Sequence, residues 1–394
     1  MIKIGVLDFF SGCGGVSTGI KNLNVPGTEI HLISGFDIDP YCCSTYEKML
    51  NTPCEQIDIS EIAQDKKLLK SKIKKWNLAQ YDKIFLVGCA PCQGFAAHRK
   101  AIAGHDSRRS LFEDFCRVAT AIKPDAIFME NVPDIFSAKY WPYFETGKKL
   151  LELEGYTVKS NIYNFATFGL PQERFRAIII SFRGDFDMPE GFLQPSEFKT
   201  VRQAIGCLPM LGSGDKCPND PMHTVSRHRP ETINILKQVP KDGGNRPIGV
   251  GPQCLDRARK AHGGFTDVYG RLAWDRPAVT ITARCRTPSC GRFAHPELDR
   301  GLSIREAALL QGFPINFIFE GPFDDKYKQI GNAVPPLVAQ HIAEHIIMLL
   351  IGKPNKSIRG DKSHTFEVSK HVGSGFAVTI NAIKRKRTKN NDAT

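Results

Sequence analysis

The stretch LDFFSGCGGVSTGI, residues 7–20, joins a strand-like run to a glycine-rich turn and then to a helix-like pattern. The apolar run ends near Asp8, and Gly12, Gly14 and Gly15 follow within a few residues. Such a turn lets backbone amides at the start of a helix face a bound ligand. Taken alone the pattern is weak, because glycines in a tight turn also serve packing.

Strand-like runs recur through the first half of the chain, with polar, helix-compatible segments between them. They are IKIGVLDFF (2–10), IHLISGFDI (30–38), YDKIFLVGC (81–89) and PDAIFMENV (124–132). This alternation predicts an α/β fold, with a parallel sheet covered by helices on both faces. We expect a first domain at 1–186, a smaller irregular domain at 187–270, a segment at 271–351 that returns to the first domain, and a basic, flexible tail at 352–394.

Composition limits the class of protein. The 394 residues are 41% hydrophobic and 24% charged, which is typical of globular chains. We expect no membrane span, since no apolar run approaches ~18 residues, and no signal peptide. Twelve cysteines are too sparse for a disulfide scaffold, which favours free thiols in the cytoplasm. Of the net charge of +12, the tail from Gly352 carries +7, so charge alone argues only modestly for nucleic acid.

The stretch LVGCAPCQGF, residues 86–95, contains a Cys-x-x-Cys pair that has three common meanings. A redox dithiol usually exposes its first cysteine, whereas Cys89 ends an apolar run. A zinc site needs two further ligands, and the nearest pair, Cys285 and Cys290, lies far along the chain. The third meaning is a nucleophilic Cys92 in the loop beyond the strand. No metal is expected.

Charged residues at other strand ends favour the nucleophile. Asp37 in GFDID and Asp58 in QIDIS follow successive strands, and acids there suit the ribose of an adenosine-type cofactor. Glu130 in FMENVP ends another strand and could hydrogen-bond a ring nitrogen. Arg174 and Arg176 in PQERFR alternate, so they are expected to share one face of a strand.

The chain resembles the DNA (cytosine-5)-methyltransferases. The family's motifs occur in order from about Val6 to Ile347, as DFFSGCGG, DIDP, GCAPCQGF, MENVP, PQERFRAI, RLAWDRPAVTITAR and GNAVPP. Together they are highly specific. Ala90 and Ala96 depart from the proline and serine usual there, which affects loop rigidity and rate rather than the chemistry. The resemblance implies a Rossmann-like sheet that binds S-adenosylmethionine, with residues 187–270 as a target-recognition domain.

The resemblance also implies roles for individual residues. Phe10 and the Gly12–Gly15 turn would flank the methionine part of S-adenosylmethionine, Asp37 would hold the ribose, Ile38 would pack on adenine and Asp58 would accept from its amino group. The pocket would be completed by Asp8, Ser11, Asn332 and Ala333.

Cytosine C5 is a poor nucleophile, so its methylation first needs a thiolate at C6, which Cys92 would supply. Glu130 would bind the N3 and amino edge, and Arg176 with Arg174 the O2 side. The base must be flipped out of the duplex, and residues 96–110 would close over it.

Double-stranded DNA is the expected substrate, and a restriction endonuclease acting on the same site is a candidate partner. The expected DNA contacts are Gln93, His98, Arg99, Arg108, Arg109, Arg227, Arg229 and Arg246. We expect a monomer in the cytoplasm, near the nucleoid in a prokaryote. The alternatives are a tRNA cytosine-5 methyltransferase of the same fold, an inactive DNA-binding relative and a thiol-disulfide oxidoreductase.

Overall fold

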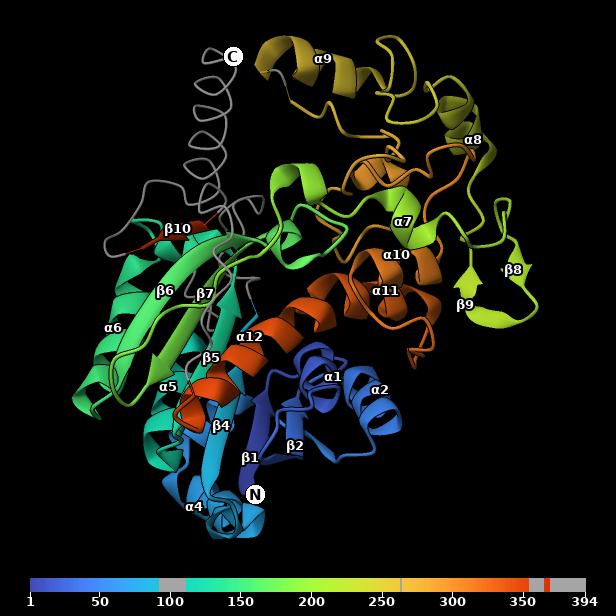
Figure 1. The fold of residues 1–394 in the computed structure, drawn as a ribbon. Coiled ribbons are helices and arrows are strands. Elements are labelled where there is room, and N and C mark those ends of the chain that lie inside the picture. The colour runs from blue at the N-terminus through green and yellow to red at the C-terminus, as the bar shows by residue number, and fades with distance from the viewer. Residues whose placement is uncertain (92–110, 263, 354–364, 369–394) are drawn as a thin grey trace. The chain divides into compact units, whose positions relative to one another are not determined.

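The computed structural model describes residues 1–91, 111–262, 264–353 and 365–368 of the chain (Figure 1). The described residues fold into two compact units. Unit 1 comprises the described residues of Met1–Phe168, Phe175–Gln194 and Pro336–Thr394, and unit 2 comprises those of Gly169–Arg174 and Pro195–Pro335.

Unit 1 is built around a sheet to which the described residues contribute eight strands, in the order β10-β6-β7-β5-β4-β1-β2-β3. The strands are β1 (Ile2–Phe9), β2 (Thr28–Asp37), β3 (Cys54–Gln56), β4 (Lys83–Gly88), β5 (Ala126–Asn131), β6 (Thr157–Asn164), β7 (Phe175–Phe182) and β10 (Thr365–Glu367). The first five pair in parallel, and β6, β7 and β10 pair antiparallel. The strand order reverses between β1 and β4, and such a switch point is where open α/β sheets bind ligands.

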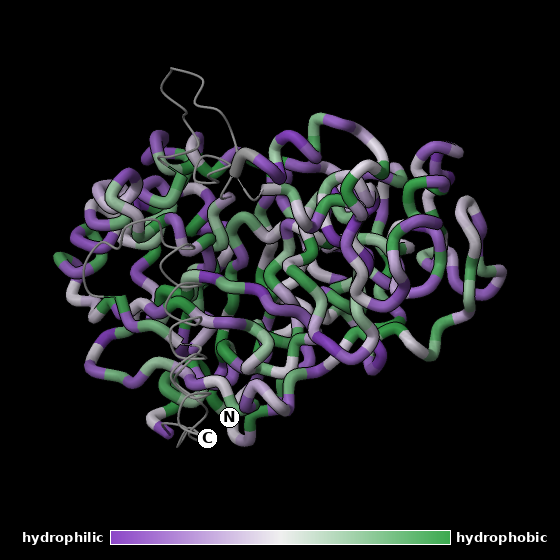
Figure 2. The backbone as a smooth tube through the Cα atoms, turned by 90° about the horizontal axis from the view of Figure 1, so that it is seen from above, coloured by the Kyte–Doolittle hydropathy of each residue, from purple (hydrophilic) through white to green (hydrophobic). Residues whose placement is uncertain are grey.

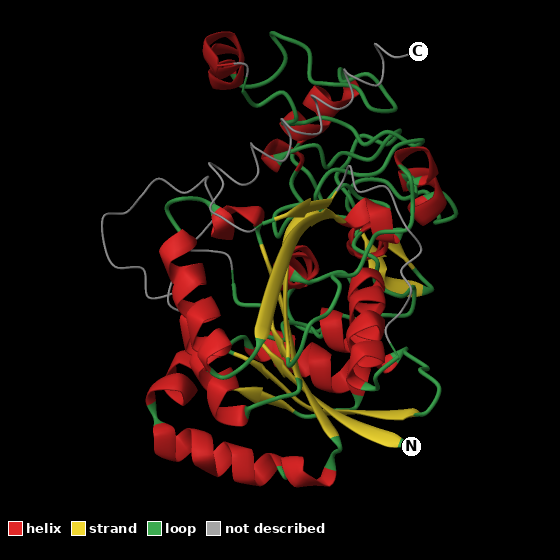
Figure 3. Ribbon diagram, turned by 60° about the vertical axis from the view of Figure 1, so that its left-hand side comes forward, coloured by secondary structure: helices red, strands yellow, loops and turns green. Residues whose placement is uncertain are grey.

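Helices cover both faces of this sheet (Figure 3). Those of unit 1 are α1 (Gly15–Lys21), α2 (Pro40–Leu50), α3 (Ile59–Gln64), α4 (Lys66–Trp76), α5 (Leu111–Ile122), α6 (Trp141–Leu153) and α12 (Pro336–Leu350). Helices α1, α2 and α12 pack together, and α3 to α6 form a second group. Because both faces are covered, β4 and β5 read as nearly continuous apolar runs, KIFLVG and AIFMEN.

Close packing fixes the helix that follows the glycine turn. A Cβ atom at Gly19 in α1 would lie 2.4 Å from the carbonyl oxygen of Pro336, at the start of α12. The two helices therefore touch through their backbones, which only glycine allows at this position. On the other face, Phe9 stacks on Phe36 with ring centroids 4.5 Å apart, and Trp76 meets Phe9 edge-on.

Unit 2 contains little regular structure. Its elements are α7 (Val201–Ile205), β8 (Lys216–Cys217), β9 (Asp220–Thr224), α8 (Pro230–Lys237), α9 (Gln253–His262), α10 (Ile304–Leu310) and α11 (Phe323–Asn332). Buried arginines hold its loops. Arg271 donates to the carbonyl oxygens of Val239, His295, Leu298 and Leu236. Arg300 forms a bidentate pair with Glu306, with both N–O distances 2.7 Å. Charged donors of this kind satisfy loop carbonyls that no strand partner reaches.

The units differ in extent from the predicted domains. The segment 271–351 was expected to return to the first domain, but the chain rejoins unit 1 only at Pro336. The reason is that residues after 271 make their backbone contacts within unit 2. Ala278, for example, forms an isolated β-bridge with Gln172 of the same unit. Within the predicted tail, Thr365–Glu367 pair with β6 as an added edge strand.

Hydropathy alternates in short stretches along most of the chain (Figure 2). Among the described residues, Phe323–Leu350, which includes α11 and α12, is the one helical stretch long and apolar enough to cross a membrane. Its most apolar window is 67% buried inside the structure, as in the core helix of a soluble protein. It is therefore weak support for a span.

Candidate functional site

The glycine turn is held open at the carboxyl end of β1. Phe10, Gly12 and Gly14 have φ angles of 55°, 54° and 87°, so the chain turns through left-handed conformations that favour glycine. The amide of Gly12 donates to Oδ2 of Asp37 at 2.8 Å, which ties the turn to the end of β2. A Cβ atom at Gly12 would meet nothing within 4 Å, so there is open space beside the turn.

Asp37 is the central carboxylate of this turn. Its second oxygen, Oδ1, accepts from the amide of Asp39 at 2.9 Å. Burial raises the pKa of Asp37, while the hydrogen bonds from the Asp39 and Gly12 amides act to lower it. Beside it, Ile38 is 64% exposed, an unusual position for a large apolar side chain next to a buried strand. An exposed apolar surface beside a carboxylate suits a nucleoside, whose base is apolar on its faces and whose ribose donates hydrogen bonds.

Asp58 follows β3 and starts α3. Its Oδ1 accepts from both the amide and the hydroxyl of Ser60, at 2.9 and 2.8 Å. The carboxylate thus caps the helix with one oxygen. Its other oxygen makes no hydrogen bond with the described residues and could accept from a ligand. Asp37, Ile38 and Asp58 all lie at the carboxyl ends of neighbouring parallel strands, as the sequence predicts.

Asp8 supports the turn from inside. It is 1% exposed, and its Oδ2 accepts from the hydroxyl of Ser17 at 2.6 Å. Ser17 in turn lies 2.9 Å from the hydroxyl of Tyr46. Burial raises the pKa of Asp8 to about 7, although the Ser17 hydrogen bond lowers it and the charge of Asp37 raises it further. Asp8 therefore supports the turn through α1, and its contact with a cofactor stays a prediction. Ser17 and Tyr46 were not predicted, since nothing in the local pattern sets them apart.

Glu130 is the last residue but one of β5, at the same edge of the sheet. Its side chain is buried, and its Oε1 lies 2.9 Å from Nε of Arg176. The two atoms form an ion pair but are not aligned as a hydrogen bond. The antiparallel register of β5 and β7 explains the pair, because Glu130 lies opposite Ile178 and Arg176, two residues from Ile178, is on the same face of the sheet. This brings together two of the predicted catalytic residues.

Arg174 is placed differently from its neighbour. Strand β7 begins at Phe175, so Arg174 and Arg176 do not share a strand face. Arg174 is 2% exposed, and its guanidinium donates to the carbonyl oxygens of Ile281, Gly331 and Ala333 at 3.0 to 3.3 Å. Arg174 thus connects its own motif, PQERFRAI, to RLAWDRPAVTITAR and GNAVPP within unit 2. A catalytic role for Arg174 stays a prediction, and this placement argues for a structural one.

The GNAV motif also lies in unit 2. A Cβ atom at Gly331 would lie 2.1 Å from the amide nitrogen of Ala283, so this glycine lets α11 pack directly on the backbone of another motif. Asn332, the last residue of α11, is exposed. Ala333 is buried, and its carbonyl oxygen accepts from the Gln311 side chain at 2.7 Å. Their predicted contact with a cofactor remains untested.

The start of the Cys92 loop is fixed by Asn131. The side-chain amide of Asn131 donates to the carbonyl oxygen of Ala90 at 3.3 Å, and its oxygen accepts from the amide of Val132. Sequence reasoning missed Asn131, although it stands next to Glu130. Cys89 donates its amide to the Phe9 carbonyl. Burial, with the charges of Glu130 and Asp8, holds the pKa of the Cys89 thiol well above its usual value, so Cys89 is a poor nucleophile.

Several predicted residues lie outside the part of the chain that the structure describes. They are Cys92, Gln93, His98, Arg99, Arg108 and Arg109. Of the predicted DNA contacts that are described, Arg227 and Arg229 are exposed, whereas Arg246 is buried. The described residues contain no group of three or more His, Cys, Asp or Glu side chains that could hold a metal ion.

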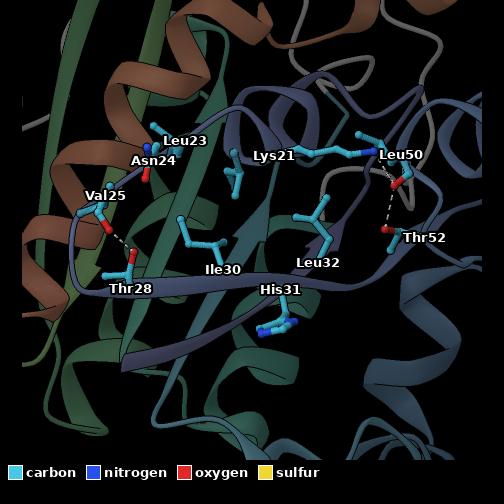
Figure 4. A pocket seen from close by; sticks show the side chains of 11 residues that line it. Lys21, Leu23, Asn24, Val25, Thr28, Ile30, His31, Leu32, Leu50 and Thr52 are labelled. Atoms are coloured by element: carbon cyan, nitrogen blue, oxygen red, sulfur yellow. Dashed lines mark hydrogen bonds between the residues drawn. The ribbon is translucent and has the colours of Figure 1, made fainter. Parts of the chain in front are cut away.

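A pocket of about 290 Å³ opens elsewhere in unit 1, beside α1 and the first half of β2 (Figure 4). Its lining includes Ile20, Lys21, Ile30 and Leu32, and the ammonium of Lys21 donates to the carbonyl oxygen of Leu50 at 2.9 Å. None of the motif acids lines it. The chemistry of the chain therefore points to the carboxyl ends of the strands, and not to this pocket.

Known proteins are similar to this chain over most of its length. The model of the family described as C-5 cytosine-specific DNA methylase matches residues 4–348. The Type II methylase M.HgiDII of Herpetosiphon aurantiacus is 34% identical over 354 residues, which cover 88% of this chain and 96% of that protein. The Type II methyltransferase M1.HphI of Haemophilus parahaemolyticus is 31% identical over 352 residues, covering 87% and 86%.

Solved structures share the fold. A DNA modification methyltransferase candidate encoded within an E. coli prophage superposes with a TM-score of 0.67 at 22% identity, covering 88% of this chain and 99% of that one. The methyltransferase EhMeth of Entamoeba histolytica gives a TM-score of 0.55 at 17% identity, covering 89% and 99%. At these identities the likeness supports the fold alone, while the family match spans nearly the whole sequence. The chain therefore belongs to the family of C-5 cytosine-specific DNA methylases.

Proposed function

We propose that this protein transfers a methyl group from S-adenosylmethionine to C5 of a cytosine within a short sequence of double-stranded DNA. The observation that carries the proposal is the arrangement at one edge of the unit 1 sheet. There an open glycine turn tied to Asp37 and the Glu130–Arg176 ion pair follow strands of the same sheet. The glycine turn with Asp37 suits an adenosine-type cofactor, and the ion pair suits the polar edge of a pyrimidine.

The residues of the turn fit S-adenosylmethionine. Asp37 would accept from the ribose hydroxyls, the exposed Ile38 would pack on adenine, and the unused oxygen of Asp58 would accept from the adenine amino group. Open space beside Gly12 leaves room for the methionine part, whose carboxylate suits amides at the start of α1. When bound, this cofactor supplies an electrophilic methyl group on a sulfonium.

Cys92 would attack C6 of the cytosine as a thiolate, which makes C5 nucleophilic enough to take the methyl group. A base then removes the C5 proton, and the C6–S bond breaks as Cys92 leaves. Cys92 lies outside the described residues, so its role rests on the motif and on the exclusion of Cys89, whose buried thiol resists ionisation. Because C6 is inaccessible in stacked DNA, the base must be flipped out.

Glu130 and Arg176 would hold the flipped base. A carboxyl group can bind the N3 and amino edge of cytosine, and a guanidinium can donate to O2, where negative charge develops. The ion pair between them sets the distance between the two groups before substrate arrives. Such preorganised polar groups stabilise the transition state more than the ground state.

The tRNA alternative has less support, because the matching family and the relatives are named for DNA methylation or as Type II methyltransferases. The Type II relatives also favour a cognate restriction endonuclease as a partner of this chain. We propose that the protein acts in the cytoplasm as a monomer and that target choice resides in the 187–270 region.

The test is to express the protein in a host that lacks cytosine methylation and to map 5-methylcytosine by bisulfite sequencing. Methylation confined to one short motif is expected, and its loss in Cys92→Ser but not in Cys89→Ser would support the assigned nucleophile. Covalent trapping on DNA that contains 5-fluorocytosine, measured by mass, tests the adduct directly. Methylation of tRNA in place of DNA would overturn the proposal.

A further inference from the structure

We propose that helix α9 (Gln253–His262) reads bases of the target DNA through Gln253, Arg257 and Lys260. This inference rests on the proposed function, because it names the residues that would choose the methylated sequence. In Figure 1, α9 lies at the end of unit 2 away from α10 and α11. Its outward side is therefore not used in packing against those helices.

The three side chains lie on one face of the helix. Their spacing of four and three residues brings them into a single stripe. All three are exposed, and Gln253 and Arg257 form no hydrogen bond or ion pair with any described residue. Their chemistry suits base edges in the major groove, since arginine donates two hydrogen bonds to guanine and glutamine pairs with adenine. Lys260 suits a phosphate.

Residues outside this stripe anchor the helix to unit 2. Leu255 packs on a buried cluster that contains Leu236, Val268, Tyr269 and Ala294. Asp256 accepts from the guanidinium of Arg246 at 2.7 Å and from the amide of Gly249 at 2.9 Å. Arg259 donates to the carbonyl oxygen of Arg246 at 3.2 Å. These contacts fix both the position of α9 and the direction in which its outer face points.

Arg246 is the centre of this support. It is 2% exposed, and it also donates to the carbonyl oxygens of Pro247 and Val250. Burying a guanidinium costs free energy unless it is paired. A solvated surface helix needs no such anchor, whereas side chains that read bases must be held rigidly by their supporting residues. Arg246 thus positions α9 and does not itself contact a base.

The charged side chains of α9 are mostly basic. Asp256 is the one acid between Gln253 and Lys260, and its carboxylate is turned inward to Arg246. Asp256 lies one helical turn before Lys260, and its pKa is lowered by the hydrogen bonds that its carboxylate accepts from Arg246 and from the amide of Gly249, and further by the charge of Lys260. The stripe thus carries the positive charges of Arg257 and Lys260 beside one carboxylate that is already paired. Such a surface is attracted to DNA, and a helix of this size fits the major groove.

The experiment compares Gln253→Ala, Arg257→Ala and Lys260→Ala with the wild-type protein. Lys237→Ala, at the exposed end of α8, is the matched control for loss of a positive charge in the same unit. Methylated sites are sequenced in a plasmid library with randomised bases, and kcat/KM is measured on the preferred duplex. We expect Arg257→Ala to lower kcat/KM on that duplex by about 5- to 150-fold and to relax the preference at one base position.

The other variants separate base recognition from the general attraction between positive charge and DNA. Gln253→Ala should relax the preference at a different position, and Lys260→Ala should weaken all sites alike and reduce the salt dependence of binding by about one unit of slope. The inference is overturned if an active wild type and its Gln253 and Arg257 variants share the same motif and rate. If the wild type methylates no DNA, the proposed function falls and the inference falls with it.

Discussion

Replacing Asp8 with asparagine tests whether the carboxyl beneath the glycine turn is held in an unfavourable environment. Asp8 is 1% exposed, and burial raises its pKa from 3.8 to about 7. In the unfolded chain the group ionises near pH 4, whereas in the native protein it keeps its proton until about pH 7. The native state therefore binds the extra proton, and stability falls as the pH rises between these two values.

The size of this loss follows from the pKa difference of about three. Each pKa unit corresponds to about 1.4 kcal/mol, so at most ~4 kcal/mol is lost by pH 8. Asparagine is nearly isosteric, cannot ionise and can still accept from the Ser17 hydroxyl. We therefore expect Asp8→Asn to have a free energy of unfolding close to that of the wild type at pH 4. At pH 8 it should exceed the wild type by up to ~4 kcal/mol.

Urea unfolding followed by circular dichroism at pH 4, 6 and 8 measures this difference. Asp65→Asn is the control, because Asp65 is an exposed N-cap of α4 and asparagine caps equally well. The control should follow the wild-type pH profile. If the gap between Asp8→Asn and the wild type is the same at every pH, the raised pKa is not the cause of any stability change, and the reasoning fails.

Three further predictions concern other parts of the molecule. Glu130→Gln should lower kcat much more than it weakens DNA binding, since it removes the charge paired with Arg176 and the proposed contact to the base; equal losses in single-turnover rate and in affinity would contradict this role. Glu306→Gln should lower the free energy of unfolding by about 3 kcal/mol, because it leaves the buried Arg300 without a counter-charge while keeping an acceptor for the Ser303 amide. A change below 1 kcal/mol in urea unfolding would refute that estimate. Deletion of residues 369–394 should reduce the salt dependence of DNA binding and leave the methylated motif unchanged, because the tail is basic and the cut spares β10; a new motif in bisulfite sequencing would count against it.

The low pKa of Glu306 also predicts that unit 2 becomes less stable at acid pH. Burial alone would raise the pKa of Glu306, but the hydrogen bonds and charge of Arg300 reverse the effect and hold it below the usual value. Because the native pKa is depressed, the stabilisation is present above the unfolded pKa of about 4.5 and is lost as the pH falls below it. The Asp8 carboxyl therefore lowers stability as the pH rises, whereas the Glu306 carboxyl lowers stability as the pH falls. The variants Asp8→Asn and Glu306→Gln test the two effects separately.

The sequence by itself predicted the α/β class, the strand–turn–helix unit and the placement of Asp37, Asp58 and Glu130 at strand ends. These features are local. Apolar runs of strand length, glycines at a turn and acids directly after a strand are set by neighbours in the chain, and parallel strands then bring their carboxyl ends to one edge of the sheet.

Only the tertiary structure decided what each arginine and acid does. In the sequence Arg174 and Arg176 look alike, yet one donates to carbonyls more than a hundred residues away and the other pairs with Glu130. The sequence predicts Arg246 as a DNA contact and Asp8 as a cofactor contact, and only the structure shows that Arg246 pairs with Asp256 and that Asp8 accepts from Ser17 beneath α1. The end of a long polar side chain is placed by packing between distant segments, and no local pattern encodes the groups that it will meet there.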